Sequence, residues 1–286
     1  MPTDPVFAPA ALADFAALYP ETPGRIAHGL AGHPAFTIPA LVALAGRLDP
    51  KQVEYNRGDL PVGVDPRADV ANGLDIAETI RSIEHNGSWM VLKFVETDPE
   101  YRALLEETLA ELRSVVDHVT GAMLKMEAFL FISSPNAMTP FHFDPEHNIL
   151  LQMQGSKTMT VFPADDPAIA APVQHETFHM GGHRNLPWDD AFLARGTPVA
   201  LAPGQAVYVP VKAPHFVRNG PATSISFSIT WRSEWSYREA SAHGLNALLR
   251  KAGLDPAAPA RFPAQNHAKS LAYRAIRKVR RTLGQD

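Results

Sequence analysis

The chain has 286 residues, of which 45% are hydrophobic and 20% charged, and it contains no cysteine. A chain of this length can bury a substantial core. No apolar run approaches the roughly 18 residues that a membrane span needs, and the first residues lack the basic start and apolar core of a secretory signal. The absence of cysteine excludes disulfides, thiolate metal sites and cysteine nucleophiles. These features predict a cytoplasmic protein without a transmembrane segment.

The net charge of −4 hides an uneven distribution. Residues 261–286 carry seven Lys and Arg against one acidic residue, which leaves a net charge of −10 on residues 1–260. An acidic body repels nucleic acid, so we expect nucleic acid to be an unlikely partner. Only the basic C-terminal segment is suited to an anionic surface.

Residues 1–121 are expected to form a helix-rich region that packs on a barrel. The strongest helix prediction is Pro99–Val119, because Asp98 can cap it and apolar residues recur at a spacing of three to four. Scattered Pro, Gly and Asp predict a loop over Asp49–Ala71. Shorter helical or apolar segments are predicted at Ala10–Tyr19, Pro39–Leu48 and Asp75–His85.

After Gly121 the pattern changes to short strands rich in β-branched and aromatic residues. A run of strands with few helices between them predicts a sandwich or barrel over residues 122–235. The segment Asp165–Gly196 interrupts this run and is expected to be an insertion over the barrel mouth. Two closing helices, Arg238–Ala252 and Ala264–Leu283, are predicted within residues 236–286. The predicted strands are Met126–Ser133, Asn148–Met153, Thr158–Phe162, Pro198–Ala202, Ala206–Pro210, His215–Asn219 and Thr223–Trp231.

Three residues suggest a metal site. His142 and Asp144 are two positions apart, so on a strand both side chains point to one side, and His215 follows a later predicted strand and turn. Two imidazoles and one carboxylate on one side of Fe(II) leave open positions for oxygen chemistry, although manganese or nickel would bind the same groups. The pair alone is a weak signal in a chain with twelve histidines. The alternative is a hydrogen-bonded surface pair with a histidine that caps a turn.

Lys157 strengthens the metal interpretation. Alternation along its strand places Lys157, Met159 and Val161 on one face, which the apolar residues predict to be the inner one. A buried ammonium needs an anion, and a dicarboxylate cosubstrate would supply one. The alternative is a lysine whose head group reaches the rim.

A second group of histidines, His175, His179 and His183, has the spacing of a zinc-binding helix. Gly181-Gly182 argues against a helix there. We therefore expect loop histidines that line the mouth of the barrel.

The stretch from Thr139 to Pro163 resembles the JmjC/cupin-like Fe(II)- and 2-oxoglutarate-dependent oxygenases, most closely the asparaginyl-hydroxylase type that acts on hypoxia-inducible factor. The second half of the barrel is similar as well, through a Pro-Gly turn and a Tyr-x-Pro before the distal histidine. The similarity extends over about residues 122–235. The matching positions are Thr139, His142, Asp144, Asn148, Gly155, Lys157, Phe162-Pro163, Tyr208, Pro210 and His215.

This resemblance implies a mainly β fold with helical flanks, built on a double-stranded β-helix. It implies Fe(II) held by His142, Asp144 and His215, and O2 and 2-oxoglutarate as cosubstrates. The 2-oxoglutarate would be held by Lys157 and Thr139, with Asn148 beside it. Ser228 occupies the place where these hydroxylases carry an asparagine on the last strand, and it is assigned to the same pocket.

The implied activity is hydroxylation of a C–H bond, and a protein or peptide side chain is the favoured substrate. A small-molecule substrate and N-methyl-lysine demethylation are alternatives that the metal site cannot separate. A non-catalytic cupin-type ligand-binding or regulatory protein is a rival from another class, and Lys157 argues against it because a passive apolar pocket gains nothing from a buried cation.

The basic C-terminal helix carries an apolar stripe of Ala272, Ile276, Val279 and Leu283. The resemblance implies a homodimer formed through such helices. A helix on an anionic surface and a solvated terminal helix are the alternatives.

Overall fold

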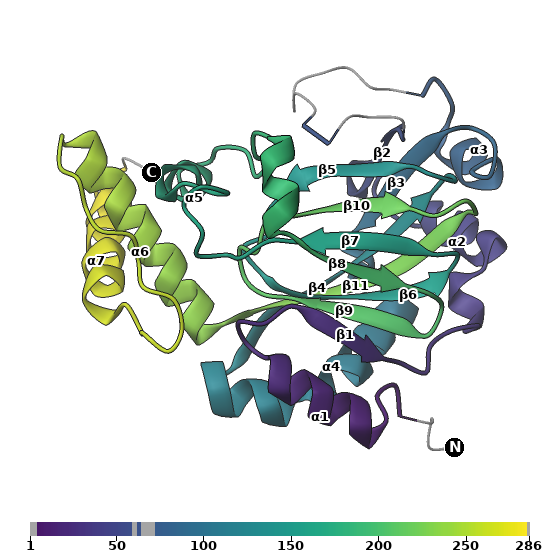
Figure 1. Cartoon of the computed structure of the whole chain (residues 1–286), viewed down its shortest axis with the longest axis horizontal. Helices are drawn as coiled ribbons and strands as arrows, with labels where there is room; N and C mark the ends of the chain where they lie inside the picture. The colour runs from purple at the N-terminus through teal and green to yellow at the C-terminus, as the bar shows by residue number, and fades with distance from the viewer. Residues whose placement is uncertain (1–4, 59–61, 64–71, 285–286) are drawn as a thin grey trace.

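The computed structural model describes residues 5–58, 62–63 and 72–284, and its centre is a pair of facing antiparallel sheets (Figure 1). The larger sheet has the order β1-β9-β6-β11-β4-β3-β2, and the smaller sheet has the order β5-β10-β7-β8. The strands of the larger sheet, in that order, are Gly24–Ala27, Gln205–Val209, His147–Gln154, Ser224–Ser233, Met123–Ser133, Ser88–Lys93 and Val53–Arg57. Those of the smaller sheet are Met138–His142, His215–Asn219, Lys157–Val161 and Thr197–Leu201.

Strands β4 to β11 form the jelly-roll, or double-stranded β-helix, and this confirms the predicted fold class. All seven strands predicted after Gly121 are present, with ends that differ by a few residues. β11 is buried at every position from Ser224 to Ser233, because the smaller sheet and the helical layer cover its two faces. One apolar cluster, which includes Leu150, Met159 and Val217, lies between the sheets.

The first third of the chain contributes strands as well as helices. β1 pairs with β9, and β3 pairs with both β4 and β2, so these strands extend the larger sheet at its two ends. The predicted loop over Asp49–Ala71 was wrong at Val53–Arg57, which is β2, whereas residues 59–61 and 64–71 lie outside the described residues. β3 is buried on both faces and shows no alternation of polar and apolar residues. Its pattern therefore lacked the two-residue period that marks a half-exposed strand.

The N-terminal helices cover the outer face of the larger sheet (Figure 1). The prediction for the long helix is confirmed: α4 spans Pro99–Thr120, and the Asp98 carboxylate accepts a hydrogen bond from the Glu100 backbone N–H at 3.1 Å. Leu105 and Leu109 of α4 belong to one apolar cluster with the sheet. The other helices of this region are α1 (Pro9–Leu18), α2 (Ile38–Ala45), α3 (Ile76–Arg81) and the short 3-10 helices Pro34–Phe36, Pro50–Gln52 and Val95–Thr97.

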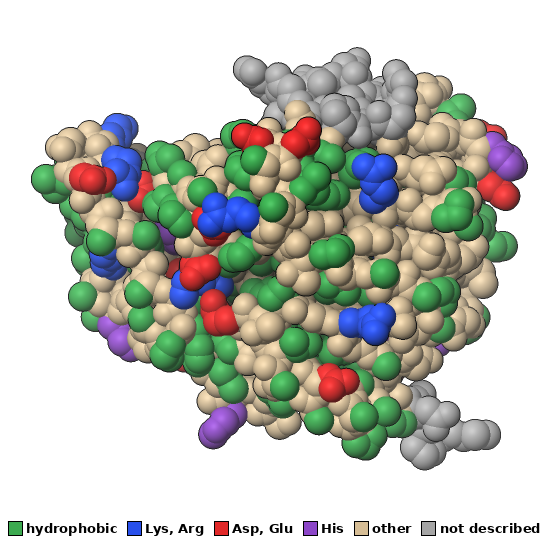
Figure 2. All heavy atoms as spheres, in the orientation of Figure 1, with side chains coloured by type: hydrophobic (Ala, Val, Ile, Leu, Met, Phe, Trp, Pro, Cys, Tyr) green, Lys and Arg blue, Asp and Glu red, His purple; other side chains and the backbone are tan. Residues whose placement is uncertain are grey.

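The remaining helices gather at one end of the barrel (Figure 1). α5 (Pro172–His179) and a 3-10 helix (Asp190–Arg195) belong to the predicted insertion, and α6 (Glu234–Lys251) packs against both α5 and α7 (His267–Thr282). The two predicted closing helices are thus present. On the face shown in Figure 2, charged side chains occur in small scattered groups rather than in one broad patch. None of the described helices is both long and apolar enough to span a membrane.

A pair of leucines tests the packing of the helical layer. Leu109 is fully buried in α4, whereas Leu254 is 57% exposed after α6. We expect Leu109→Ala to lower the free energy of unfolding by about 2–5 kcal/mol, because a buried cavity remains. Leu254→Ala should change it by no more than about 0.5 kcal/mol. Urea unfolding of the two variants measures the difference, and equal losses would contradict the assigned packing.

Candidate metal centre and its pocket

The pairing of two strands brings the three predicted metal ligands together. His142 ends β5, Asp144 follows two residues later, and His215 begins β10 directly opposite His142 in the ladder. One ligand atom from each residue lies within 4.8 Å of the others. The Nε2 atoms of His142 and His215 are 3.7 and 3.6 Å from Asp144 Oδ2. The three side chains therefore converge on one point, as the sequence predicted.

Hydrogen bonds orient both imidazole rings toward that point. His142 Nδ1 donates to the Pro140 carbonyl at 2.7 Å, and His215 Nδ1 donates to the Ala213 carbonyl at 2.9 Å. A proton on each Nδ1 leaves the Nε2 lone pair free, and such backbone contacts commonly hold metal-binding histidines. Each ring is therefore held in the tautomer that a metal ion requires.

The protonation states also suit a cation. Burial lowers the pKa of His142 to about 3 and lowers that of His215, so both rings are neutral at pH 7. Burial alone would raise the pKa of Asp144, but the guanidinium of Arg184, 2.7 Å from Asp144 Oδ1, holds it below its usual value. Neutral imidazoles and an ionised carboxylate are the ligand forms for divalent metals. The donor set of two nitrogens and one oxygen fits Fe(II).

The triad lies in the wall of a pocket of about 640 Å³ that also contains the four predicted cosubstrate residues, Thr139, Asn148, Lys157 and Ser228. Ser228 Oγ donates a hydrogen bond of 2.8 Å to Asn148 Oδ1, which joins the neighbouring strands β11 and β6 inside the pocket. The structure thus brings all seven predicted site residues to one cavity.

Lys157 points inward, as predicted. It is 5% exposed at the start of β7, and Met159 and Val161 on the same face are buried as well. Burial lowers the pKa of Lys157 to about 7. Within the described part of the chain no carboxylate forms an ion pair with it. A pocket with a buried amine and no protein anion beside it is suited to an acidic ligand.

Sequence reasoning missed two charged residues near the triad. Arg184 comes from the insertion and donates to Asp144 Oδ1 at 2.7 Å. Glu146 lines the same pocket, and burial together with Asp144 raises its pKa to about 7, while Arg232, 3.7 Å away, opposes this shift. Glu146 lies two positions after Asp144, as Asp144 lies two positions after His142, so this spacing could have predicted that Glu146 lies near the triad. Nothing in the local sequence marked Arg184.

The prediction for the second histidine group was partly wrong. His175 and His179 lie on α5 rather than in a loop, and their rings are 5.3 and 5.8 Å from that of His243 on α6. Only His183 of the three lines the pocket. The helix ends at His179, so the glycine pair follows the helix instead of preventing it. Burial lowers the pKa values of His175 and His179, as expected for neutral packed rings.

The fold and the triad define a jelly-roll protein with a two-histidine, one-carboxylate site. Comparison with known proteins adds a structural likeness to Escherichia coli YcfD. One YcfD structure has a TM-score of 0.53 and 18% identity and covers 92% of this chain and 66% of that chain. A second, described as a ribosomal oxygenase in complex with cobalt and 2-oxoglutarate, has a TM-score of 0.50 and 16% identity and covers 92% of this chain and 65% of that chain.

No family model matches the chain. A curated zebrafish (Danio rerio) protein, HSPB1-associated protein 1 homolog, is 33% identical over 109 residues, which is 35% of this chain and 24% of that protein. The chain thus spans about two thirds of the YcfD chains and matches about a quarter of the zebrafish protein. At these identities the structural likeness shows a shared fold. The asparaginyl-hydroxylase type remains a prediction.

Removal of one ligand tests the metal centre. We expect the protein to bind one Co(II) ion per chain. Loss of a residue that only supports a ligand weakens metal binding by about 10–100-fold, and His215→Ala, which removes a ligand, should weaken it by more. His28→Ala is the matched control, because His28 is also buried but follows β1 and lies outside the pocket. Calorimetric titration measures both affinities. Unchanged cobalt binding in His215→Ala would contradict the assignment.

Proposed function

We propose that this protein is an Fe(II)- and 2-oxoglutarate-dependent oxygenase that hydroxylates a C–H bond. The observation that carries the proposal is the combination, in one pocket, of a converging two-histidine, one-carboxylate triad with a buried Lys157 that has no carboxylate partner among the described residues. A passive binding protein has no need for both. The YcfD structure with cobalt and 2-oxoglutarate supports the proposal, because the fold is shared.

His142, Asp144 and His215 would hold the iron. Bound iron, together with 2-oxoglutarate and O2, supplies the oxidising power for hydroxylation, with succinate and CO2 as coproducts. Lys157 and Thr139 would bind the distal carboxylate of 2-oxoglutarate. The hydrogen-bonded Asn148 and Ser228 would lie beside it, as a polar wall whose positions are set by the two strands.

The protein's own contribution is to orient the reactants and to exclude water. Apolar side chains of both sheets, among them Phe131, Leu150 and Val217, line the inner pocket. Lys157 and the triad lie in the same pocket, so an acidic cosubstrate would be bound through charge by the lysine and through its ligating atoms by the metal site. Arg184 keeps Asp144 ionised and ready to bind a cation.

We propose a protein or peptide side chain as the substrate. The outer part of the pocket is lined by polar and charged residues that include the ion pairs Lys93–Glu54 and Lys125–Glu127, the latter at 3.1 Å. Such a rim offers hydrogen bonds to a polar chain. The related fold in a ribosomal oxygenase supports a protein substrate. We also propose a cytoplasmic location, which fits the absence of cysteine.

The iron and cosubstrate assignment has a direct test. Anaerobic protein with Fe(II) and 2-oxoglutarate should show a weak visible absorption band, and with air it should convert 2-oxoglutarate to succinate. A peptide library from lysate should then gain one oxygen atom in a reaction that depends on 2-oxoglutarate. Folded, iron-loaded protein without the absorption band would refute the oxygenase proposal.

The lowered pKa of Lys157 predicts a dependence on pH. The free lysine is charged below pH about 7 and increasingly neutral above it, whereas a bound carboxylate stabilises the charged form. We therefore expect the affinity for 2-oxoglutarate to fall about fivefold between pH 7 and 8, and to approach a tenfold fall per pH unit above that range. Lys157→Met should weaken binding and abolish this slope while metal content stays unchanged. Thr139→Val is the control, because it should weaken binding yet keep the slope, and a slope retained in Lys157→Met would exclude Lys157.

We further propose a homodimer formed through α7. Leu271 and Val279 on this helix and Leu283 directly after it are 63%, 58% and 63% exposed among the described residues, and such exposed apolar side chains favour a partner surface. Light scattering should give twice the mass of one chain, and Leu271→Glu with Val279→Glu should give monomers. Arg274→Glu with Arg277→Glu, on a different face of α7, should leave the dimer intact. A monomeric wild-type protein would exclude the dimer.

A further inference from the structure

The turn between β9 and β10, residues 210–214, connects the metal centre to the C-terminal helices. It leads directly into His215, and its Lys212 backbone N–H donates to the Asp144 carbonyl at 2.8 Å. Lys212 has a φ of 61°, the left-handed region that a lysine adopts only when its surroundings hold it there. One short turn therefore supports both Asp144 and His215.

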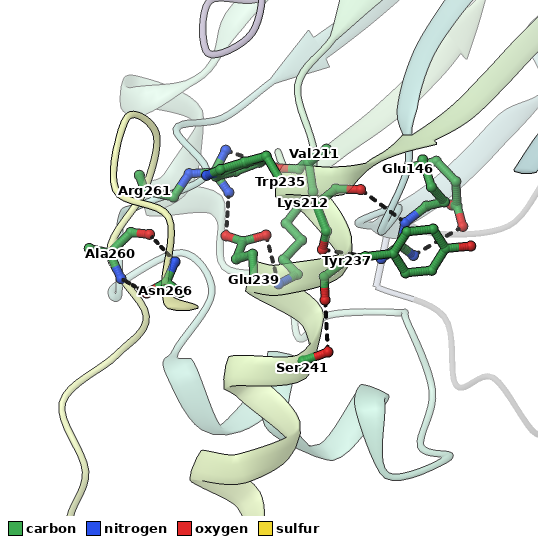
Figure 3. A network of polar contacts seen from close by, with 12 residues as sticks. Glu146, Val211, Lys212, Trp235, Tyr237, Glu239, Ser241, Ala260, Arg261 and Asn266 are labelled. Atoms are coloured by element: carbon green, nitrogen blue, oxygen red, sulfur yellow. Dashed lines mark hydrogen bonds and ion pairs between the residues drawn. The ribbon is translucent and has the colours of Figure 1, made fainter. Parts of the chain in front are cut away.

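The side chain of Lys212 is held from the far side of this turn. Lys212 Nζ lies 3.0 Å from Glu239 Oε2 of α6, and the two side chains are 2% and 1% exposed (Figure 3). A buried charge that loses its partner is strongly destabilised. The lysine cannot leave Glu239 without a large energetic cost, so α6 determines where the turn lies.

Arg261 adds a second connection between the C-terminal segment and the turn. It donates to Glu239 Oε1 at 2.8 Å and to the Val211 carbonyl at 3.0 Å (Figure 3). It also pairs with Glu21 at 2.9 Å. Two cations and two carboxylates are thereby balanced in one cluster. The turn is held through the backbone of Val211 and through the side chain of Lys212.

We infer that Lys212 and Glu239 are positioning residues of the metal centre, which keep Asp144 and His215 at a ligating separation from each other. This inference rests on the proposed metal site. It makes α6 and the segment around Arg261 part of the structure that sets metal affinity, although none of their side chains is a ligand. Supporting residues of this kind typically change metal affinity about 10–100-fold when they are lost.

Co(II) binding tests this inference, because its visible spectrum reports coordination geometry and its titration gives an affinity. We expect Glu239→Gln and Lys212→Met each to weaken Co(II) binding by about 10-fold or more and to alter the spectrum. The double variant Lys212→Met with Glu239→Leu removes both buried charges, so it should regain thermal stability. It should nevertheless keep the weak cobalt binding, because the connection to the turn is still missing.

Glu176→Gln is the matched control. Glu176 is also a nearly fully buried carboxylate, and it pairs with Arg250 at 2.8 Å, away from the turn. It should lose stability but keep the wild-type cobalt affinity and spectrum. Equal cobalt binding by Glu239→Gln and Glu176→Gln would overturn the inference. Should the single variants fail to fold, the double variant decides, and wild-type cobalt affinity in that variant would overturn the inference as well. A wild-type protein that binds no cobalt would instead refute the proposed metal site.

Discussion

The antiparallel pairing of β5 with β10 is the contact on which the candidate site depends. It places His215 opposite His142, and Asp144 lies two residues beyond the end of β5. A shift of one residue in this ladder would turn the ligands to opposite faces of the sheet. The register is held by the apolar residues between the sheets, such as Met159 and Val217. The same packing that stabilises the jelly-roll therefore also assembles the ligand set.

The pocket separates its charges in a way that suits an acidic cosubstrate. The carboxylate of Asp144 is held ionised by Arg184 at one end, and the amine of Lys157 lies at another position among apolar side chains. The neutral histidines add no charge of their own. The low dielectric of the buried pocket strengthens each interaction with a bound ion. Fold and electrostatics therefore favour the same class of ligand.

The helical layers contribute to the site as well as to stability. The N-terminal helices cover the outer face of the larger sheet through one apolar cluster, so the inner face is left to form the pocket. Glu239 of α6 and Arg261, in the segment between α6 and α7, form a buried or nearly buried ion pair at the contact with the barrel. Such paired charges tolerate few alternative arrangements, because each must keep its partner. This end of the molecule is thereby tied to one geometry near the metal ligands.

The sequence by itself determined seven of the barrel strands, the long helix α4 and the candidate positions His142, Asp144, Lys157 and His215, because these follow from alternation, capping and spacing within short segments. Thr139, Asn148 and Ser228 were predicted from the resemblance to known oxygenases. Only the tertiary structure revealed Arg184 beside Asp144, the neighbours of His175 on α6, and the incorporation of β1, β2 and β3 into the larger sheet. Each of these features joins residues far apart in the chain. In addition, β3 is a strand that is buried on both faces. Local periodicity does not reveal such contacts, because they form only when the two sheets and the helices around them pack together.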